Sequence, residues 1–341
     1  MIPGLPLLFR GRRPTVDAAR APADDPRRMI LRTEALTKVF QVGVRRRVVR
    51  AVDALDLGVS ENEIFGFVGP NGAGKTTTIK MLMGLIFPTS GKAFIFDAPI
   101  PSDAAKARIG YLPEHPAWHE FQTGAEALRF FATLAGVPRA ERARRADELL
   151  GLVGLADAAG RQIRKYSKGM QQRLGIAQAL IGDPSLVVLD EPMSGLDPVG
   201  RREMRDLILG LKRRGKTVFF STHILSDVEA LCDRVGVIIG GKLRDAGRLD
   251  ALLTGGLRSV EATFAGPGAA GPFAGAAAIA REGDRATWSF SDAAAADVAV
   301  RAVVASGGRV VALTEHRDTL EDYFMRRVEG GPELARQATA R

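Results

Sequence analysis

GPNGAGKT, residues 69–76, is the stretch that decides the fold. It matches the pattern G-x-x-x-x-G-K-[ST], and it lies between a strand-like run, EIFGFV, and a helix-like run, TTTIKMLMGL. Its three glycines allow the loop to wrap so closely that its N–H groups can surround a phosphate. Lys75 can then reach the β- and γ-phosphates of a nucleotide, and the Thr76 hydroxyl can ligate Mg²⁺. The stretch therefore predicts the phosphate-binding loop (P-loop) of an α/β nucleotide-binding domain.

Short β-branched runs alternate with helical stretches from residue 30 to about residue 250. EIFGFVG precedes KTTTIKMLMG, SLVVLD precedes PVGRREMRDLILGLKRRG, and KTVFFST precedes ILSDVEALCD. This alternation predicts an α/β domain with a largely parallel core sheet. Helical patterns alone fill residues 120–182, which indicates a helical subdomain inserted into that fold.

The two ends of the chain differ in composition from the α/β domain. Residues 1–29 predict a disordered leader, with Met29 a possible true start. The alanine-rich stretch AGPGAAGPFAGAAAIA predicts a loop or a weak helix. Short strands (ATWSFS, RVVALT), a helix (DAAAADVAVRAVVASGG) and a final amphipathic helix (DTLEDYFMRR) predict a small α+β domain over residues 256–328. The main α/β domain then covers residues 30–255, and a disordered tail covers 329–341.

Charge and composition narrow the choice of partners. The formal charge of +9 and the pI of about 10.0 are compatible with nucleic acid or an anionic membrane surface. The basic residues are scattered over amphipathic helical patterns, and no aromatic residues alternate with them, so no nucleic-acid partner is expected. The longest apolar runs are strand-sized, well below the roughly 20 residues of a membrane helix. A single cysteine, Cys232, excludes an internal disulfide and fits a reducing compartment.

Two apolar strands end in polar side chains that suit phosphate chemistry. SLVVLDEP ends in Asp190 and Glu191. Because alternate side chains of a strand point to opposite faces, one carboxylate can approach Mg²⁺ while the other faces an attacking water. KTVFFSTH brings His223 to the same carboxyl edge of the sheet, where open α/β sheets bind ligands. The other three histidines have no such placement and no metal-ligand spacing.

Residues 165–180, KYSKGMQQRLGIAQAL, predict a helix with an unusual first turn. Ser167 stands at the cap position, but Lys168 and Gly169 follow it in place of the usual acidic residues. Positive charge and free backbone N–H groups are therefore presented together. This combination predicts that an anion docks there.

Five motifs together resemble one family. GPNGAGKTT, YSKGMQQR, LVVLDEP, SGLD and STH are similar, in order and spacing, to the Walker A, signature, Walker B, D-loop and switch-histidine motifs of ATP-binding cassette (ABC) transporter ATPases. The resemblance covers about residues 30–250 and implies a P-loop NTPase fold, with a RecA-like core sheet plus a helical subdomain. It also implies ATP and Mg²⁺ as cofactors and ATP hydrolysis as the activity. The stretch ending in LEDYFMRR resembles the C-terminal extension of subunits that serve drug, lipid or polysaccharide exporters.

The resemblance implies a role for each matching residue. Glu191 is the implied general base or water orienter, His223 the γ-phosphate sensor, and Lys75 the charge on the transferring phosphate. The signature serine and glycine are implied to bind the ATP held by a second subunit. The implied nucleotide-binding residues are Phe40, Gly69, Pro70, Asn71, Gly72, Ala73, Gly74, Lys75, Thr76, Thr77, Ser167, Lys168, Gly169 and Asp197, and the implied metal ligands are Thr76, Asp190 and Glu114.

Four of these positions have a second interpretation. Phe40 replaces the tyrosine that stacks on adenine in the family, and as a lone aromatic it can equally be a core residue. Lys168 replaces the first signature glycine and either attracts phosphate or points to solvent. Asp197 resembles the D-loop aspartate, although Asp-Pro is also a common way to start a helix. Glu114 replaces the Q-loop glutamine and lies either at the metal or on an exposed loop.

The resemblance also implies partners and a location. The chain would act as a homodimer, or as a heterodimer with a similar ATPase, and would serve separate transmembrane permease subunits. It would then be cytoplasmic and peripheral on the cytoplasmic face of the inner membrane. One alternative is a cytosolic ABC ATPase acting on ribosomes or nucleic acid, and another is a GTPase-like switch. The chain has a single GxxxxGKT motif and no room for a coiled coil, which disfavours the first alternative. It has no guanine-specifying Asn-Lys-x-Asp motif, which disfavours the second.

Overall fold

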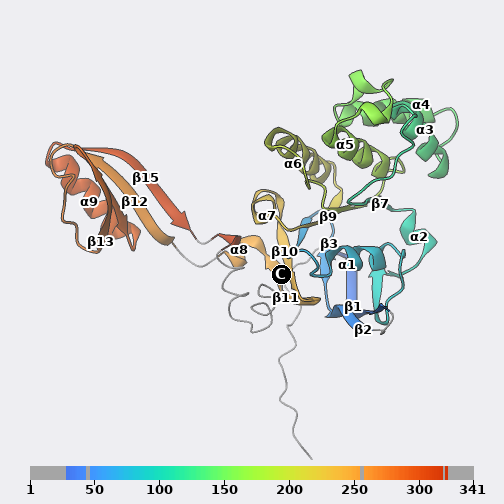
Figure 1. Cartoon of the computed structure of the whole chain (residues 1–341), viewed down its shortest axis with the longest axis horizontal. Helices are drawn as coiled ribbons and strands as arrows, with labels where there is room; N and C mark the ends of the chain where they lie inside the picture. Colours follow the sequence, from blue (N-terminus) through green and yellow to red (C-terminus); the bar gives the residue numbers. More distant parts are fainter. Residues whose placement is uncertain (1–27, 44–46, 254–256, 318, 322–341) are drawn as a thin grey trace, which may run out of the picture.

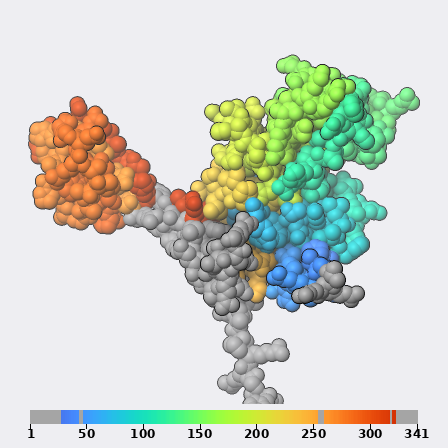
Figure 2. Space-filling model, viewed as in Figure 1, coloured from blue at the N-terminus to red at the C-terminus, as the bar shows by residue number. Residues whose placement is uncertain are grey.

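The chain forms a larger and a smaller unit in the computed structural model (Figure 1). The main unit runs from Met29 to Leu253, and the accessory unit runs from Leu257 to Arg317. In Figure 2 the accessory unit, in orange and red, projects from the body of the main unit. The structure describes residues 28–43, 47–253, 257–317 and 319–321; the leader to residue 27 and the tail expected over 329–341 lie outside these ranges.

A six-stranded sheet forms the centre of the main unit, in the order β11-β10-β4-β9-β8-β7. Neighbouring strands from β10 to β7 are parallel, and β11 adds an antiparallel edge, which confirms the predicted sheet. Strands β4, β8, β9 and β10 are buried at every position, as expected of parallel strands covered on both faces. The bounds are β4 Ile64–Val68, β7 Ile109–Leu112, β8 Leu186–Asp190, β9 Thr217–Thr222, β10 Arg234–Ile239 and β11 Lys242–Arg248.

A second, antiparallel sheet packs against the helix that follows the P-loop. Its path is β2-β1-β5-β6, and β3 also pairs with β1. Helix α1, Lys75–Leu82, buries Ile79 and Leu82 in one apolar cluster with Leu31 of β1 and Phe65 of β4. This packing brings the second sheet to the rim of the P-loop. The bounds are β1 Met29–Val42, β2 Arg47–Leu55, β3 Gly58–Ser60, β5 Ser90–Ile95 and β6 Ala98–Pro99.

Helices replace strands between β7 and β8, in the green region of Figure 1. Thr123 caps α3 in a reciprocal pair with Glu126, and these hydrogen bonds lower the pKa of Glu126. Helices α3, α4 and α5 share one apolar core that includes Leu128 and Leu174. The bounds are α3 Gly124–Leu134, α4 Arg142–Leu152, η1 Ala156–Ala158, η2 Ile163–Lys165 and α5 Lys168–Ala179; a short helix, α2 Asp103–Lys106, precedes β7.

Helices α6, Pro198–Arg213, and α7, Leu225–Leu231, follow strands β8 and β9, and the short helix α8, Leu249–Leu252, follows β11. Arg205 of α6 donates two hydrogen bonds, of 3.0 and 2.5 Å, to one oxygen of Asp227 on α7. Asp227 is fully buried, so removal of its partner would leave an uncompensated charge. The pair therefore ties the helix after the D-loop to the helix after His223. None of the helices in the described ranges combines the length and the hydropathy that a bilayer crossing requires.

The accessory unit is an antiparallel sheet, β13-β14-β12-β15, with α9 packed on one face. It has its own core, which includes Phe264, Trp288 and Val303. The expectation of a loop or weak helix is wrong for residues 276–280, which belong to strand β13. Alanine has a low β propensity, but β13 gains its structure by pairing with β14, which no local pattern reveals. The bounds are β12 Leu257–Ala265, β13 Ala276–Glu282, β14 Arg285–Phe290, α9 Ala293–Ala305 and β15 Arg309–Arg317.

Leu320 returns from the accessory unit to the main unit. Its side chain is fully buried and belongs to the same apolar cluster as Val228 and Leu231 of α7. Its backbone N–H donates to the Glu229 carboxylate. The main unit thus contains a core residue from beyond the accessory unit. The remainder of the final helix expected over 318–327 lies outside the described residues.

Candidate functional site

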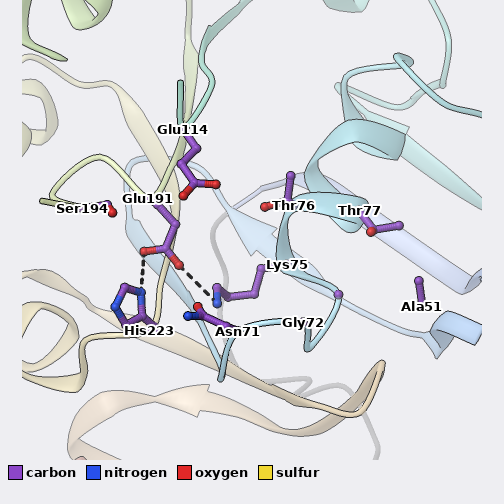
Figure 3. Close-up of a pocket in the computed structure, with 11 residues that line it drawn as sticks. Ala51, Asn71, Gly72, Lys75, Thr76, Thr77, Glu114, Glu191, Ser194 and His223 are labelled. Carbon is purple, nitrogen blue, oxygen red and sulfur yellow. Dashed lines mark hydrogen bonds and ion pairs between the residues drawn. The ribbon is translucent and has the colours of Figure 1, made fainter. Parts of the chain in front are cut away.

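A cavity of about 380 Å³ lies where the P-loop meets the carboxyl edge of the parallel sheet (Figure 3). Its walls come from the P-loop, the start of α1, and the segments that follow β7, β8 and β9. Strand β2 adds one residue from the second sheet. The lining residues are Ala51, Asn71, Gly72, Gly74, Lys75, Thr76, Thr77, Glu114, Glu191, Ser194 and His223.

Two glycines of the P-loop are required by the close approach of neighbouring backbone. A Cβ atom at Gly69 would lie 2.2 Å from the carbonyl oxygen of Ile238 on β10. A Cβ atom at Gly74, where φ is +107°, would lie 2.4 Å from the carbonyl oxygen of Ala51 on β2. The loop is therefore held between the two sheets. The first backbone N–H groups of α1, which have no acceptor within the helix, are left at the cavity.

Lys75 is buried, with only 6% of its surface exposed. Its Nζ donates to the carbonyl oxygens of Gly69, at 2.7 Å, and Pro70, at 3.2 Å. The same Nζ lies 3.2 Å from Oε1 of Glu191. A buried ammonium requires such partners, since an unpaired charge in the interior is strongly destabilising. The P-loop lysine is thus paired with the carboxylate that follows Asp190.

Glu191 lies between Lys75 and His223 at the cavity and contacts both side chains (Figure 3). Its Oε1 faces Lys75, and its Oε2 lies 2.9 Å from Nδ1 of His223. The Glu191 backbone is in the left-handed region, with φ at +49°. Its N–H donates a hydrogen bond of 3.1 Å to the hydroxyl oxygen of Ser221. Strained non-glycine conformations of this kind are concentrated at functional sites. The fold therefore holds Lys75, Glu191 and His223 in mutual reach.

Asp190 lies beside these three residues, against the P-loop. Its Oδ1 accepts hydrogen bonds from Ser221, at 2.6 Å, and Thr76, at 3.3 Å. Burial raises the pKa of Asp190, the two hydrogen bonds oppose that rise, and the charges of Glu114 and Glu191 add to it. No cationic side chain of the described residues counters this rise in pKa, and a divalent cation would do so.

The oxygen donors at this point fit Mg²⁺. Asp190 and Thr76 offer a carboxylate and a hydroxyl, which are ligands that a hard cation prefers. The described residues contain no cluster of three or more His, Cys, Asp or Glu side chains able to hold a metal. Mg²⁺ at a nucleotide site does not require such a cluster, because phosphates and waters complete its coordination.

Glu114 lies at the cavity and not on a remote loop. It follows β7, and its carboxylate points toward the space between Glu191 and Thr76 in Figure 3. Its backbone carbonyl accepts a hydrogen bond of 3.1 Å from Nε2 of Gln172 on α5. The geometry therefore favours the interpretation of Glu114 as a site residue, while its action on a metal stays a prediction.

Phe40 does not line the cavity. It is half-buried on β1 and pairs with Val49 of β2, the strand that also carries the lining residue Ala51. The register of β1 and β2 shifts at Ala51, which interrupts the alternation of side chains between Val49 and Ala51. Stacking of Phe40 on an adenine ring therefore stays a prediction. Other expected residues that shape the P-loop without lining the cavity are Gly69, Pro70 and Ala73.

The signature residues Ser167, Lys168 and Gly169, and Asp197 of the D-loop, lie outside the cavity of their own chain. Ser167 caps α5 by accepting a 3.2 Å hydrogen bond from the N–H of Met170. Lys168 folds back along its own D-loop, where a Cβ at Gly195 would lie 2.3 Å from Nζ. Asp197 caps α6 by accepting from the N–H of Gly200 at 2.8 Å. Both serine and aspartate thus start helices, and a role on ATP requires a second subunit.

Sequence reasoning missed Ala51 and Ser194 as lining residues. Ser194 begins the SGLD motif, so the motif itself was the available signal. Ala51 has no local signal, because its place follows from the packing of β2 against Gly74.

Comparison with known proteins identifies the family. The sequence profile described as ABC transporter matches residues 52–194. An uncharacterised ABC transporter ATP-binding protein of Synechocystis sp. is 40% identical over 304 residues, which cover 88% of this chain and 84% of that protein. The chain belongs to the ABC transporter family. It is an ATP-binding subunit with ATPase activity coupled to transport, as its motifs imply, and an action on ribosomes or nucleic acid is not favoured.

Two further proteins are similar to this ABC ATPase. The fluoroquinolones export ATP-binding protein of Mycobacterium tuberculosis is 45% identical over 196 residues, 57% of this chain and 64% of that protein. A solved dimeric ATP-binding cassette, in a post-hydrolysis state with ADP and phosphate, superimposes with a TM-score of 0.59 at 24% identity. That match covers 64% of this chain and 99% of the other, and it confirms the P-loop NTPase fold. That cassette is a dimer.

Proposed function

We propose that this ABC ATPase hydrolyses Mg-ATP at the interface of two cassettes and thereby drives export through separate permease subunits. The observation that carries the proposal is the contact chain of Lys75, Glu191 and His223 beside Thr76 and Asp190 in one cavity. The name of the mycobacterial relative supports export as the direction. The direct test is phosphate release from Mg-ATP by the purified protein, alone and with its membrane partners.

The contacts of Lys75 suggest how ATP prepares the site. Nζ of Lys75 lies 3.2 Å from the Glu191 carboxylate, which balances its charge. The phosphates of ATP compete for this ammonium, because they carry more charge than one carboxylate. Glu191 is then released to orient a water molecule and accept its proton. The water oxygen bonds to the γ-phosphorus as the bond to the β,γ-bridging oxygen breaks. His223 contacts Glu191 and also lines the cavity, so it is placed to contact the γ-phosphate.

Mg²⁺ would be held by Thr76 and Asp190, with Glu114 as a third oxygen donor. When bound, the ion neutralises charge on the phosphates and orients them. The raised pKa of Asp190 supports this assignment, because a cation would relieve the negative charge that burial disfavours.

The second subunit would complete each site with its signature motif. The Ser167 hydroxyl accepts a hydrogen bond as the cap of α5, so its own proton stays available to donate to a phosphate oxygen. The N–H of Gly169 lies in the first turn of the same helix, where amides have no helical acceptor. Lys168 would add positive charge from its position along the D-loop, and Asp197 would face the same interface. The partner is a second copy or a similar ATPase.

Permease subunits would dock on the helical subdomain and place the protein on the cytoplasmic face of the inner membrane. Phe121 is 72% exposed, and Phe130 and Leu134 of α3 are also exposed. These apolar side chains lie on the subdomain that follows the Glu114 segment. Co-purification with multi-helix membrane proteins from adjacent reading frames tests this part of the proposal.

We also propose the domain division of the chain: an ATPase domain over 30–255, with a helical subdomain over about 120–182, and an accessory domain over 256–328. The separate core around Phe264 and Trp288 supports an independent accessory domain. Leu320 is the exception, because it packs in the core of the main unit.

Replacement of Ser167 by alanine is expected to lower turnover about 10- to 100-fold. A hydrogen bond to a charged acceptor contributes about 1.5–3 kcal/mol. The measurement is steady-state ATPase activity. Ser102→Ala is the matched control, because Ser102 also caps a helix, α2, but belongs to none of the five motifs. In mixed dimers of Ser167→Ala with Lys75→Ala, one composite site stays intact, so a complete loss of turnover would contradict action of the signature in trans.

Replacement of Glu114 by glutamine is expected to keep ATPase activity but to raise the Mg²⁺ concentration required. A neutral amide oxygen binds a hard cation more weakly than a carboxylate does. Glu114→Ala is further expected to uncouple hydrolysis from transport in the assembled complex. The measurement is a Mg²⁺ titration of the ATPase rate at fixed ATP, with the exposed Glu120→Gln as control. Superimposable curves for wild type and Glu114→Gln would leave Glu114 no role at the metal.

A further inference from the structure

Gln172 is a buried polar residue to which the site described above gives no role. It lies on the second turn of α5, the helix that Ser167 caps, and only 2% of its surface is exposed. Its Nε2 donates a 3.1 Å hydrogen bond to the backbone carbonyl of Glu114. The Glu114 carboxylate lines the nucleotide cavity. One side chain therefore joins the signature helix to the segment that enters the cavity of the same chain.

The amide of Gln172 is not explained by packing. Its Oε1 is buried and has no hydrogen-bond partner among the described residues. A buried acceptor without a partner is destabilising, and a methionine would fill nearly the same volume without that penalty. The Nε2 donor to Glu114 is the one favourable polar contact that this amide makes within the described ranges.

The surrounding contacts are close enough to transmit a displacement. A Cβ at Gly175, the next turn of α5, would lie 2.4 Å from Leu112 at the end of β7 and 3.8 Å from the Trp118 ring. These two residues flank Glu114 along the chain. Well-packed interfaces respond to displacement by moving together, because they have little free volume. Helix α5 and the segment from residue 112 to residue 118 thus act as a packed pair.

We propose that Gln172 is a positioning residue that couples the signature end of α5 to Glu114. The proposal rests on the proposed function, in which Ser167 contacts the ATP of a second subunit and Glu114 acts at the metal of its own site. When phosphate binding shifts the start of α5, Gln172 carries the shift to the Glu114 backbone. Each chain then links the ATP site that it completes in its partner to the ATP site that it holds itself.

Gln172→Met is the informative variant, because it removes the amide donor and the unpartnered acceptor while it keeps side-chain length. Thermal stability without nucleotide is expected to be unchanged or higher. The half-saturating Mg²⁺ concentration for ATPase activity is expected to rise on the order of 3- to 10-fold, with kcat at saturating Mg²⁺ within about twofold. Gln178→Met, at a half-buried position of the same helix, is the matched control and leaves the titration unchanged.

A double-mutant cycle separates positioning from a general effect on the fold. If Gln172 acts through Glu114, Gln172→Met adds no further Mg²⁺ shift to Glu114→Ala, although the two single shifts are both present. Additive shifts would overturn the proposal.

Trp118 supplies a readout that does not depend on turnover. The chain has two tryptophans, so Trp288→Phe leaves Trp118 as the sole reporter beside α5. Addition of Mg-ATP is expected to change Trp118 emission in this background, and Gln172→Met is expected to reduce the change severalfold while nucleotide binding persists. A full emission change in Gln172→Met defeats the inference. A protein with intact Gln172 that neither binds nor hydrolyses ATP defeats the proposed function instead.

Discussion

The Lys75→Ala protein is expected to show no ATP hydrolysis above background and to bind ATP weakly. Lys75 is the buried charge at the phosphate end of the cavity, and two loop carbonyls direct it there. Each hydrogen bond between charged groups contributes about 1.5–3 kcal/mol, so loss of contacts to two phosphates removes several orders of magnitude in rate. The substitution also leaves Glu191 without its counter-ion at 3.2 Å, and that carboxylate then repels the phosphates.

Phosphate release at saturating Mg-ATP, together with calorimetric titration of ATP, measures both effects. Lys80→Ala is the matched control, because Lys80 lies on the same helix but is exposed and does not line the cavity. It is expected to retain wild-type turnover. Undiminished hydrolysis in Lys75→Ala would be incompatible with the P-loop assignment.

Replacement of Glu191 by glutamine is expected to separate binding from hydrolysis. The amide keeps the shape of the side chain but cannot accept a proton from water, and a positioned general base typically contributes about 10²- to 10⁴-fold. ATP binding is expected to persist or to strengthen, since Lys75 loses the carboxylate that competes with phosphate for it. An ATP-bound dimer should then accumulate, because the step that would open it no longer occurs.

Size-exclusion chromatography with light scattering, in the presence of ATP, detects that dimer. Asp206→Asn is a suitable control, because Asp206 is an exposed carboxylate on α6 and does not line the cavity. It should remain active and give no trapped dimer. A Glu191→Gln protein that hydrolyses ATP at the wild-type rate would remove Glu191 from the reaction. One that remains monomeric, even with its membrane subunits, would count against the ATP sandwich.

The P-loop region could be predicted from the sequence because its determinants are local. A buried strand, a glycine-rich turn and a helix occur in one continuous stretch, and the structure has β4, the loop and α1 in the same places. The carboxyl edge that brings Asp190 and His223 together could also be predicted, since parallel strands end at a common edge. In both cases the motif and the strand direction are enough.

Other features depend on contacts between distant segments and have no local signal. The pairing of Lys75 with Glu191 arises only when the P-loop and the end of β8 meet in space. Ala51 reaches the cavity because Gly74 has no side chain to exclude the β2 backbone. Strand β13 forms because β14 offers a partner, and its alanines give no strand pattern. The bond from Gln172 to Glu114 belongs to the same class.

The burial of Leu320 affects folding during synthesis and the behaviour of truncated forms of this protein. A ribosome releases the segment up to α8 before it releases Leu320, so the core beside α7 stays incomplete while the accessory unit is being synthesised. A protein shortened after Leu253 would likewise lack this core side chain and would expose Val228 and Leu231 to water. Loss of solubility in such a truncated protein would therefore result from the incomplete hydrophobic core, and would not be evidence for a regulatory function of the accessory unit.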